Sequence, residues 1–408
     1  MVTDTAVEKG YKQTEMGVIP EDWGVKELKE IVTNVIDNRG KTPPYSNIAD
    51  IELIETASIS FVNQYPDYSK VSKFVSKEVY NYWFRGHPIK NDILISTVGE
   101  YSGASAIMKE NRGTIAQNLI AIRTKEIDPT YLFYWTRSKN FKKQLNQVMM
   151  NQAQPSLRVP WLLNFYITFP KNEPEQSVIV TVLSDTDALI GHLEKLITKK
   201  KVIKQGAMQL LLTGEKRLPG FTNNWEMKRL DKYGAITMGQ SPPGNSYNEK
   251  EIGSPLLNGA SDLKEDRIFV TQYTTKPTRM SKKEDLLFCI RATIGNLQIS
   301  DKEYCLGRGV AALTVNNEYN YKFISYQLQS LFELMRNQSQ GGVIKGLRKD
   351  ELCEFSIPTP IIDEQNAIAQ ILSDMDDEII VLEQKRDKYK MIKQGMMQQL
   401  LTGKIRLL

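Results

Sequence analysis

The stretch of sequence that decides the fold occurs twice. Residues 175–218 read EQSVIVTVLSDTDALIGHLEKLITKKKVIKQGAMQLLLTGEKRL, and residues 364–407 read EQNAIAQILSDMDDEIIVLEQKRDKYKMIKQGMMQQLLTGKIRL. The two align without a gap. Both open on Glu-Gln, pass through Leu-Ser-Asp and Ile-Lys-Gln-Gly, and close on Leu-Thr-Gly-x-x-Arg. Agreement over so long a span indicates an internal repeat.

Each repeated segment has the pattern of a long helix. Apolar residues recur at steps of three and four, and acidic residues stand in the first turn. About 40 residues at ~1.5 Å each give a rod of roughly 60 Å. Such a helix with one apolar stripe needs a partner, and we expect the other copy to supply it. The alternative is that each helix packs only on its own domain. Gly206 and Gly395 weaken the helical pattern near the ends.

The repeat continues weakly outside the helices. Trp23 matches Trp225, and Asp92-Ile93-Leu94 matches Asp285-Leu286-Leu287, but most of the intervening sequence has diverged. These variable regions have a mixed α/β pattern. The expected strands are Asp92–Thr97, Leu119–Arg123, Asp285–Ile290 and Val310–Val315, and the expected helices are Tyr131–Val148 and Tyr321–Met335.

These patterns predict an α+β fold with two mixed α/β domains separated by two long helices. The expected parts are an N-terminal segment 1–22, a first domain 23–172, a central helix 173–214, a linker 215–224, a second domain 225–361, a C-terminal helix 362–403 and a tail 404–408. The two helical segments are similar in sequence, whereas the two variable regions differ. This suggests a common scaffold that carries two domains with different binding specificities.

Composition excludes several classes of protein. The 408 residues carry a net charge of +5, which permits a polyanionic partner without requiring one. Two histidines and three cysteines without a CxxC pair leave little material for a metal site or His-based catalysis, and they favour a reducing cytoplasm. No apolar run is long enough to predict a membrane span. We expect the lysine run from Lys199 to Lys204 to be a solvated helix face.

Catalytic motifs are missing from the sequence. It contains no GxGxxG after a strand, no HExxH and no GxSxG. Thr42-Pro43-Pro44-Tyr45 is similar to the Asp/Asn-Pro-Pro-aromatic motif of amino-methyltransferases, but threonine cannot replace the planar acceptor of that motif. We therefore expect a rigid loop there, no enzyme activity and no cofactor.

The best candidates for chemistry are polar, aromatic and basic residues at matched places in the two variable regions. Arg and Lys can bridge guanine, Gln and Asn can bridge adenine, and hydroxyl groups can bind phosphate. In the first region the candidates are Arg39, Lys41, Thr42, Tyr45, Thr97, Tyr101, Ser102, Gln117, Asn118, Gln154, Ser156 and Arg158. In the second they are Gln240, Ser241, Asn245, Tyr247, Arg291, Thr293, Arg308, Gln340 and Lys345. Any one of them alone could be an ordinary solvated loop residue.

The chain resembles the specificity (S) subunits of type I restriction–modification systems. The resemblance rests on Glu-Gln at 175–176 and 364–365, on Leu-Thr-Gly-x-x-Arg at 212–217 and 401–406, and on the opening from Thr14 to Trp23. It covers essentially the whole chain and is most specific in the two helical segments.

The resemblance implies a non-catalytic subunit that reads a split double-stranded DNA sequence. The two variable regions would be target recognition domains, one for each half-site. The two helices would form an antiparallel coiled coil, relate the domains by a pseudo-twofold axis and set the spacer. The implied partners are two modification (methyltransferase) subunits and the restriction (translocase and nuclease) subunits, with no membrane.

Three other functions remain open from the sequence. The chain could be a coiled-coil scaffold with two protein-binding domains, a divergent methyltransferase, or the specificity subunit of a related defence system. The bases recognised and the length of the spacer do not follow from the residues.

Overall fold

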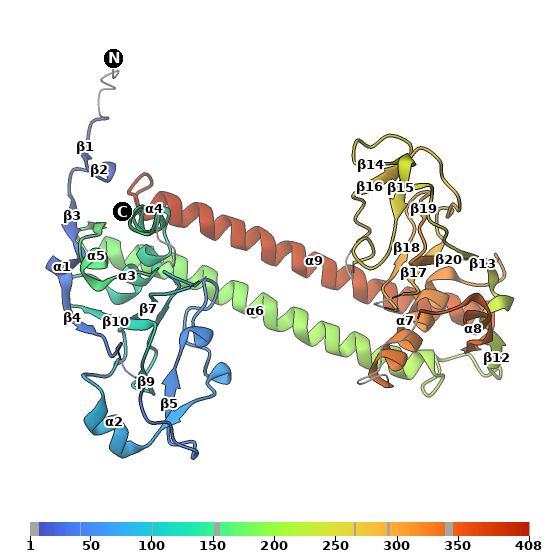
Figure 1. Cartoon of the computed structure of the whole chain (residues 1–408), viewed down its shortest axis with the longest axis horizontal. Helices are drawn as coiled ribbons and strands as arrows, with labels where there is room; N and C mark the ends of the chain where they lie inside the picture. Colours follow the sequence, from blue (N-terminus) through green and yellow to red (C-terminus); the bar gives the residue numbers. More distant parts are fainter. Residues whose placement is uncertain are drawn as a thin grey trace. The chain divides into compact units, whose positions relative to one another are not determined.

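The computed structural model describes residues 8–40, 42–99, 101–150, 156–264, 267–291, 294–338 and 346–407. The chain forms two compact units. The first joins Met1–His192 to Lys385–Leu408, and the second is Leu193–Gln384. Each unit contains one variable region and parts of both long helices (Figure 1).

The first unit is built around a four-stranded antiparallel sheet in the order β4-β10-β7-β8. These strands are β4 (Val32–Ile36), β10 (Leu119–Thr124), β7 (Ile93–Ser96) and β8 (Ser105–Ile107). The remaining strands are β1 (Tyr11–Thr14), β2 (Gly17–Pro20), β3 (Trp23–Glu27), β5 (Ile51–Ile54), β6 (Phe74–Val75), β9 (Thr114–Ile115) and β11 (Tyr166–Pro170). The short helices are α1 (Leu28–Ile31), α2 (Lys77–Trp83), α3 (Pro129–Thr136), α4 (Lys139–Met149) and α5 (Val159–Leu163).

The second unit repeats this plan, with a four-stranded sheet in the order β13-β20-β17-β18. These strands are β13 (Gly234–Met238), β20 (Val310–Val315), β17 (Leu286–Cys289) and β18 (Leu297–Ile299). The remaining elements are β12 (Glu226–Arg229), β14 (Tyr247–Asn248), β15 (Ser254–Leu257), β16 (Gln272–Thr274), β19 (Cys305–Leu306), β21 (Ser356–Thr359), α7 (Tyr321–Gln338) and α8 (Lys349–Glu354).

The weak sequence echo between the units has a structural cause. Asp92 stands just before β7, and its carboxylate accepts the backbone N–H of Ile89 at 2.9 Å. Asp285 stands just before β17 and accepts the N–H of Lys282 at 2.7 Å. Both carboxylates are buried at the same turn, so both units keep an Asp there.

The helix expected at Tyr131–Val148 is wrong as a single element. The chain leaves helical geometry at Arg137 and Ser138, between α3 and α4. The Ser138 side chain accepts the N–H of Phe141 at 3.2 Å and caps a new helix. Apolar periodicity persists through the break, which is why the pattern did not reveal it.

The two long helices are α6 (Glu173–Leu212) and α9 (Ile362–Leu400), drawn in green and red in Figure 1. Both continue through the glycines that weakened the pattern, Gly206 and Gly395. In the first unit, Ile179 of α6 and Leu400 of α9 enter the core of the recognition region. In the second unit, Leu212 of α6 and Ile368 of α9 do the same. Each long helix therefore packs on the cores of both units.

Charge is segregated along both helices. Residues 173–192 carry four acidic and no basic side chains, whereas residues 193–212 carry five basic and one acidic. Residues 362–384 carry seven acidic and no basic side chains, and residues 385–400 carry five basic and one acidic. Within each unit, the acidic part of one helix therefore accompanies the basic part of the other.

Ion pairs follow this segregation. In the first unit, Lys393 Nζ lies 2.6 Å from Asp187. In the second unit, three lysines pair with α9 at distances of 2.6 to 2.7 Å: Lys200 with Glu378, Lys201 with Glu383 and Lys204 with Asp376. Lys201 is exposed, as expected for a solvated helix face, whereas Lys200 and Lys204 are half-buried and all three also form ion pairs. Among the described residues, no helix is both long and apolar enough to cross a membrane.

Candidate nucleic-acid interface

In the first unit, four loops meet at one end of the four-stranded sheet. Their described residues are 37–40, 42–46, 97–99, 101–103, 116–118 and 156–158, which we call the first sheet-end loops. Thr97 N–H donates to Asn118 O at 2.8 Å, and Leu157 N–H donates to Thr97 O at 2.7 Å. Gln117 Nε2 donates to Thr42 Oγ1 at 2.6 Å. Residues that are far apart in sequence are thus gathered into one surface.

The predicted residues of this surface differ in their availability. Tyr45, Tyr101, Asn118 and Arg158 are exposed, and Thr42 is exposed beside half-buried Gln117. Asn118 adopts a left-handed backbone with φ +66°, which lets its side chain project from the turn before β10. Amide, phenol and guanidinium groups of this kind can reach base edges or phosphate.

Arg39 has a second role besides any contact with a ligand. Its guanidinium binds both carboxylate oxygens of Asp37, at 2.8 and 2.7 Å, and donates to Leu157 O at 3.4 Å. The Arg39 hydrogen bonds lower the pKa of the Asp37 carboxyl. Arg39 therefore ties the loop after β4 to the loop before α5, and its charge is partly neutralised.

Thr97 is a correction to the predicted set. It is completely buried, because its backbone bonds to two neighbouring loops and these cover the side chain. Ser102 and Ser156 are half-buried, and the Ser102 hydroxyl is shielded from solvent. Five further predicted residues lie outside the described part of the chain: Lys41, Gln154, Thr293, Gln340 and Lys345.

The second unit has an equivalent set of loops, formed by residues 239–247, 290–291, 307–309 and 346–347. Ile290 N–H donates to Gly309 O at 2.9 Å, and Leu347 N–H donates to Ile290 O at 2.8 Å. This repeats the bonding of Thr97 in the first unit. Of the predicted residues, Gln240, Asn245, Arg291 and Arg308 are exposed, whereas Ser241 and Tyr247 are half-buried. The two surfaces share a backbone frame and differ in side chains.

Some exposed residues near these loops were not predicted. Helix α4 carries lysines and no acidic residue, a signal that its sequence from 139 to 149 already contains. The exposed apolar pair of the loop after β5, and the phenylalanine with two cations in the loop after β15, gave no sequence signal. Isolated apolar or cationic residues in loops are common. The residues missed are Lys142, Lys143, Phe61, Val62, Lys264, Arg267 and Phe269.

The helix-end motifs form a clasp in the first unit. Glu175, at the start of α6, is completely buried and binds the guanidinium of Arg406 at 2.6 and 2.8 Å. The Trp23 indole N–H donates to the same carboxylate at 3.3 Å. Hydrogen bonds from Arg406 to Glu175 and Asp22 raise the pKa of the guanidinium well above its ordinary value. A buried carboxylate is thus paired and hydrogen-bonded.

The second unit has the matching clasp. Glu364, at the start of α9, binds Arg217 through two contacts of 2.7 Å, and Trp225 donates to it at 3.1 Å. Each Glu-Gln motif therefore pairs with the Leu-Thr-Gly-x-x-Arg motif of the other repeat. The glycines of these motifs, Gly214 and Gly403, have φ of +72° and +69°, and each lies against the tryptophan of its clasp.

The glutamines of the motifs have equally matched contacts. Gln176 donates to Pro170 O at 2.8 Å and accepts the Asp128 N–H at 3.1 Å. Gln365 donates to Pro360 O at 2.9 Å and accepts the Asn320 N–H at 3.0 Å. Each glutamine thus fixes the first turn of a long helix to the domain that precedes it.

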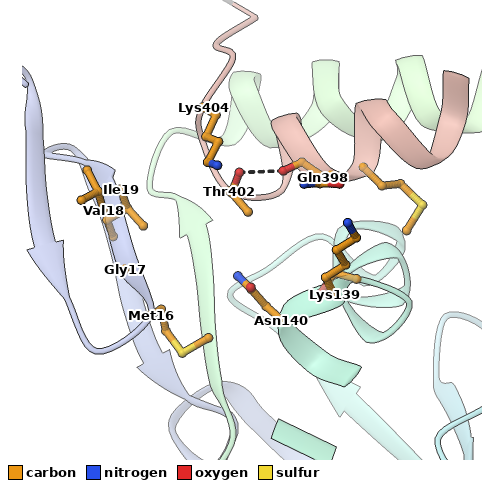
Figure 2. A pocket seen from close by; sticks show the side chains of 11 residues that line it. Met16, Gly17, Val18, Ile19, Lys139, Asn140, Gln398, Thr402 and Lys404 are labelled. Carbon is orange, nitrogen blue, oxygen red and sulfur yellow. Dashed lines mark hydrogen bonds between the residues drawn. The ribbon is translucent and has the colours of Figure 1, made fainter. Parts of the chain in front are cut away.

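A cavity of about 440 Å³ lies in the first unit, where the β1–β2 hairpin, the start of α4 and the end of α9 meet (Figure 2). Met16 and Ile19 line it from the hairpin, Lys139 and Asn140 from α4, and Lys404 from the chain after α9. None of the predicted contact residues lines this cavity. The cavity therefore belongs to the clasp region and is separate from the sheet-end loops.

Comparisons with known proteins agree with this architecture. The family described as "Type I restriction modification DNA specificity domain" matches residues 20–205 and again residues 222–390. A Methanocaldococcus jannaschii protein, provisionally named type I restriction enzyme MjaX specificity subunit, is 32% identical over 98% of this chain and 97% of its own length. The type I restriction enzyme MjaVIII specificity subunit of the same organism is 31% identical over 52% of this chain and 50% of its own length.

Solved structures show the same fold. One chain, from a study of complex assembly and conformational transition in the type I R-M system, gives a TM-score of 0.62 at 19% identity and covers 95% of this chain and 99% of its own length. The type I restriction-modification S subunit from M. genitalium gives 0.59 at 16% identity, over 93% and 96%. The chain therefore belongs to the family of type I restriction–modification DNA specificity subunits.

Proposed function

We propose that this chain is the non-catalytic reader of a bipartite DNA target, with one half-site read by each unit. The observation that carries the proposal is the pair of sheet-end surfaces. They have the same strand order and the same loop-to-loop hydrogen bonds, but they expose different side chains. A common frame with different side chains suits two different half-sites.

The proposed contacts are the predicted residues that are exposed or half-buried, together with those outside the described part of the chain; Thr97 is excluded. Arg158 and Arg308 are the strongest candidates for base recognition. Arg158 stacks on Trp161 with 4.8 Å between the guanidinium carbon and the ring centre, and Arg308 is exposed in the turn before β20. A guanidinium held in this way can bridge O6 and N7 of guanine in the major groove.

The long helices would form an antiparallel coiled coil that relates the units by a pseudo-twofold axis and sets the spacer. The reciprocal clasps and the segregated charges support this orientation, because parallel helices would put acidic residues against acidic ones. A spacer of ~6–8 base pairs at ~3.4 Å each measures roughly 20–27 Å. A helix of ~60 Å is long enough to carry a domain on each side of it.

The proposed partners are two modification subunits, which would transfer the methyl groups, and restriction subunits, which would translocate and cleave DNA. Matched apolar pairs support two equivalent docking surfaces. Val202 and Ile203 on α6 and Met391 and Ile392 on α9 occupy the same repeat positions, and all four are exposed, Val202 at 64% and Met391 at 68%. Adjacent exposed apolar residues are typical of protein interfaces.

Methylome sequencing of cells with and without this gene tests the proposal. We expect one split motif to lose its methylation when the gene is removed and to regain it on complementation. A matched variant with Arg308→Ala should relax the base preference in one half of that motif only, by about 1–3 kcal/mol. An unchanged methylome would contradict the proposed function.

A further inference from the structure

A loop of the first unit presents two neighbouring apolar side chains to solvent. Residues 60–63, which we call the tip loop, include Phe61 and Val62, which are 55% and 69% exposed. The chain after this loop runs beside the edge strand β8, because Ile107 N–H donates to Gln64 O at 2.9 Å. Strand β8 starts just after the turn that carries Tyr101. The tip loop therefore flanks the first sheet-end loops.

Arg137 fixes the backbone of the tip loop. Its guanidinium donates to five carbonyl oxygens: Ser60 at 3.1 Å, Phe61 at 3.2 Å, Val62 at 3.1 Å, Asn63, and Ser105 of β8 at 2.6 Å. The Ser60 hydroxyl accepts the N–H groups of Val62 and Asn63 at 3.3 and 3.0 Å. The backbone carbonyl and N–H groups of the tip loop are thus hydrogen-bonded on the side that faces the protein. The side chains of Phe61 and Val62 face solvent.

This use of arginine is unusual. Arg137 lies 4.4 Å from the centre of the Phe133 ring and forms no ion pair with any described residue. Burial lowers its pKa to about 10, so it stays cationic at neutral pH in an environment that disfavours charge. A half-buried cation whose guanidinium hydrogen bonds all go to carbonyl oxygens holds the tip loop in one shape.

The surroundings of the tip loop favour a polyanion over a protein surface. Helix α4 follows Arg137 directly and packs on the turn before β8, since a Cβ at Gly103 would meet Leu145. Its exposed residues Lys142 and Lys143 pair with no described carboxylate. Exposed lysines without counter-ions attract phosphate.

The equivalent loop of the second unit has related chemistry. It follows β15, and Asn296, the residue before β18, donates to its Leu263 O at 2.7 Å. It exposes Phe269 at 41%, with Lys264 Nζ at 4.7 Å and the Arg267 guanidinium at 5.7 Å from the ring centre. Both units therefore place an exposed phenylalanine and cations beside the edge strand of the sheet.

We propose that Phe61 and Val62 form an apolar wedge that presses into duplex DNA at a base step of the half-site read by the first unit. Arg137 is its positioning residue. This inference rests on the proposed function. Apolar side chains that enter a base step partly unstack it and bend the duplex. Because pyrimidine–purine steps unstack most easily, the wedge adds sequence preference without any hydrogen bond to a base.

The test uses the complex of the full chain with its modification subunits and a duplex that carries the methylated motif. 2-Aminopurine is placed at each position of the first half-site in turn, because its fluorescence rises when it is unstacked. We expect a rise at one step with the wild type. Phe61→Ala/Val62→Ala should abolish the rise and weaken binding roughly 10- to 100-fold, and Arg137→Lys should reduce both effects partially. Met227→Ala, which removes a side chain 67% exposed on β12, is the matched control and should behave as the wild type.

Three results would overturn the wedge. If the double variant binds and unstacks DNA as the wild type does, the wedge is wrong and the proposed function stands. If the variant loses its modification subunits while the DNA signal per assembled complex is unchanged, the tip loop is a protein-docking surface. If the wild-type complex does not distinguish its motif from a scrambled duplex, the proposed function fails and the wedge fails with it.

Discussion

At the scale of single residues, the molecule depends on a few buried charges with fixed partners. Glu175 and Glu364 are fully buried, and each is satisfied by one arginine and one tryptophan from elsewhere in the chain. The sequence showed that these residues repeat, but it could not show that each motif pairs with the opposite copy. The pairing of each glutamate with the arginine of the other repeat depends on which helix ends lie next to each other. That is a long-range property of the fold.

Arg406 tests the clasp. Arg406→Leu should lower the free energy of unfolding by about 3 kcal/mol, because it leaves the Glu175 carboxylate buried without its counter-ion. Urea denaturation of the full chain followed by circular dichroism measures this change. Glu175→Leu/Arg406→Leu should be more stable than either single variant, since no charge is then stranded. The control Arg348→Leu removes an exposed pair and should change stability by less than about 0.5 kcal/mol; an equal loss in both arginine variants would refute the clasp.

His87 predicts a pH dependence of stability. It stacks on Tyr80, with ring centres 3.5 Å apart, and shares a hydrogen bond of 2.8 Å with Thr114. Burial lowers its pKa below 6.5, so between the lowered value and 6.5 the unfolded chain binds more protons than the folded chain. The stability of the first unit should therefore fall as the pH drops through 6.5. Unfolding measured at pH 7.5 and pH 5.5 should show a smaller fall for His87→Phe than for the wild type, and equal falls would contradict the assignment.

At the scale of elements, regular patterns were predictable and interruptions were not. The strand at Val310–Val315 and the two long helices follow their hydrophobic periodicity. The break at Arg137 and Ser138 did not show in the pattern, because apolar periodicity runs through it and a single capping serine ends one helix and starts the next. The burial of Thr97 was equally hidden, since it depends on two other loops that cover it.

Two glycines of the second repeated segment, one inside α9 and one just after it, should respond in opposite ways to the same substitution. Gly395 lies within α9, and a Cβ there would meet nothing within 4 Å, so Gly395→Ala should stabilise the chain by about 0.5–1 kcal/mol. Gly403 has φ +69°, and a Cβ there would clash with the Pro20 ring, so Gly403→Ala should destabilise the chain by at least about 1 kcal/mol. Thermal unfolding of both variants measures the difference, and the same sign for both would contradict the helix-end geometry.

Charge reversal tests how the two helices are matched. Lys200→Glu/Lys201→Glu/Lys204→Glu should lower the stability of the second unit by about 1–3 kcal/mol, because it puts carboxylates against the acidic part of α9. Adding Asp376→Lys/Glu378→Lys/Glu383→Lys should restore most of the loss. The effect should shrink in high salt. If the three acidic-to-lysine substitutions do not restore the stability lost by the three lysine-to-glutamate substitutions, these ion pairs do not determine how α6 and α9 align.

At the scale of the whole molecule, the internal repeat indicated two domains and two helices, and the family match extends over both halves of the chain. The bases that each domain recognises could not be predicted from the sequence. Whether a loop residue can contact a base depends on the neighbouring residues that position its side chain. Arg39 illustrates this, since three of the five N–H donors of its guanidinium are used to hold its own loops together.

We propose that each unit reads one half of a split target independently of the other. Replacement of residues 23–170 by the matching domain of another family member, followed by methylome sequencing, tests it most directly. We expect a new motif in which one half is changed while the other half and the spacer length are kept. A motif changed in both halves, or changed in neither, would contradict it.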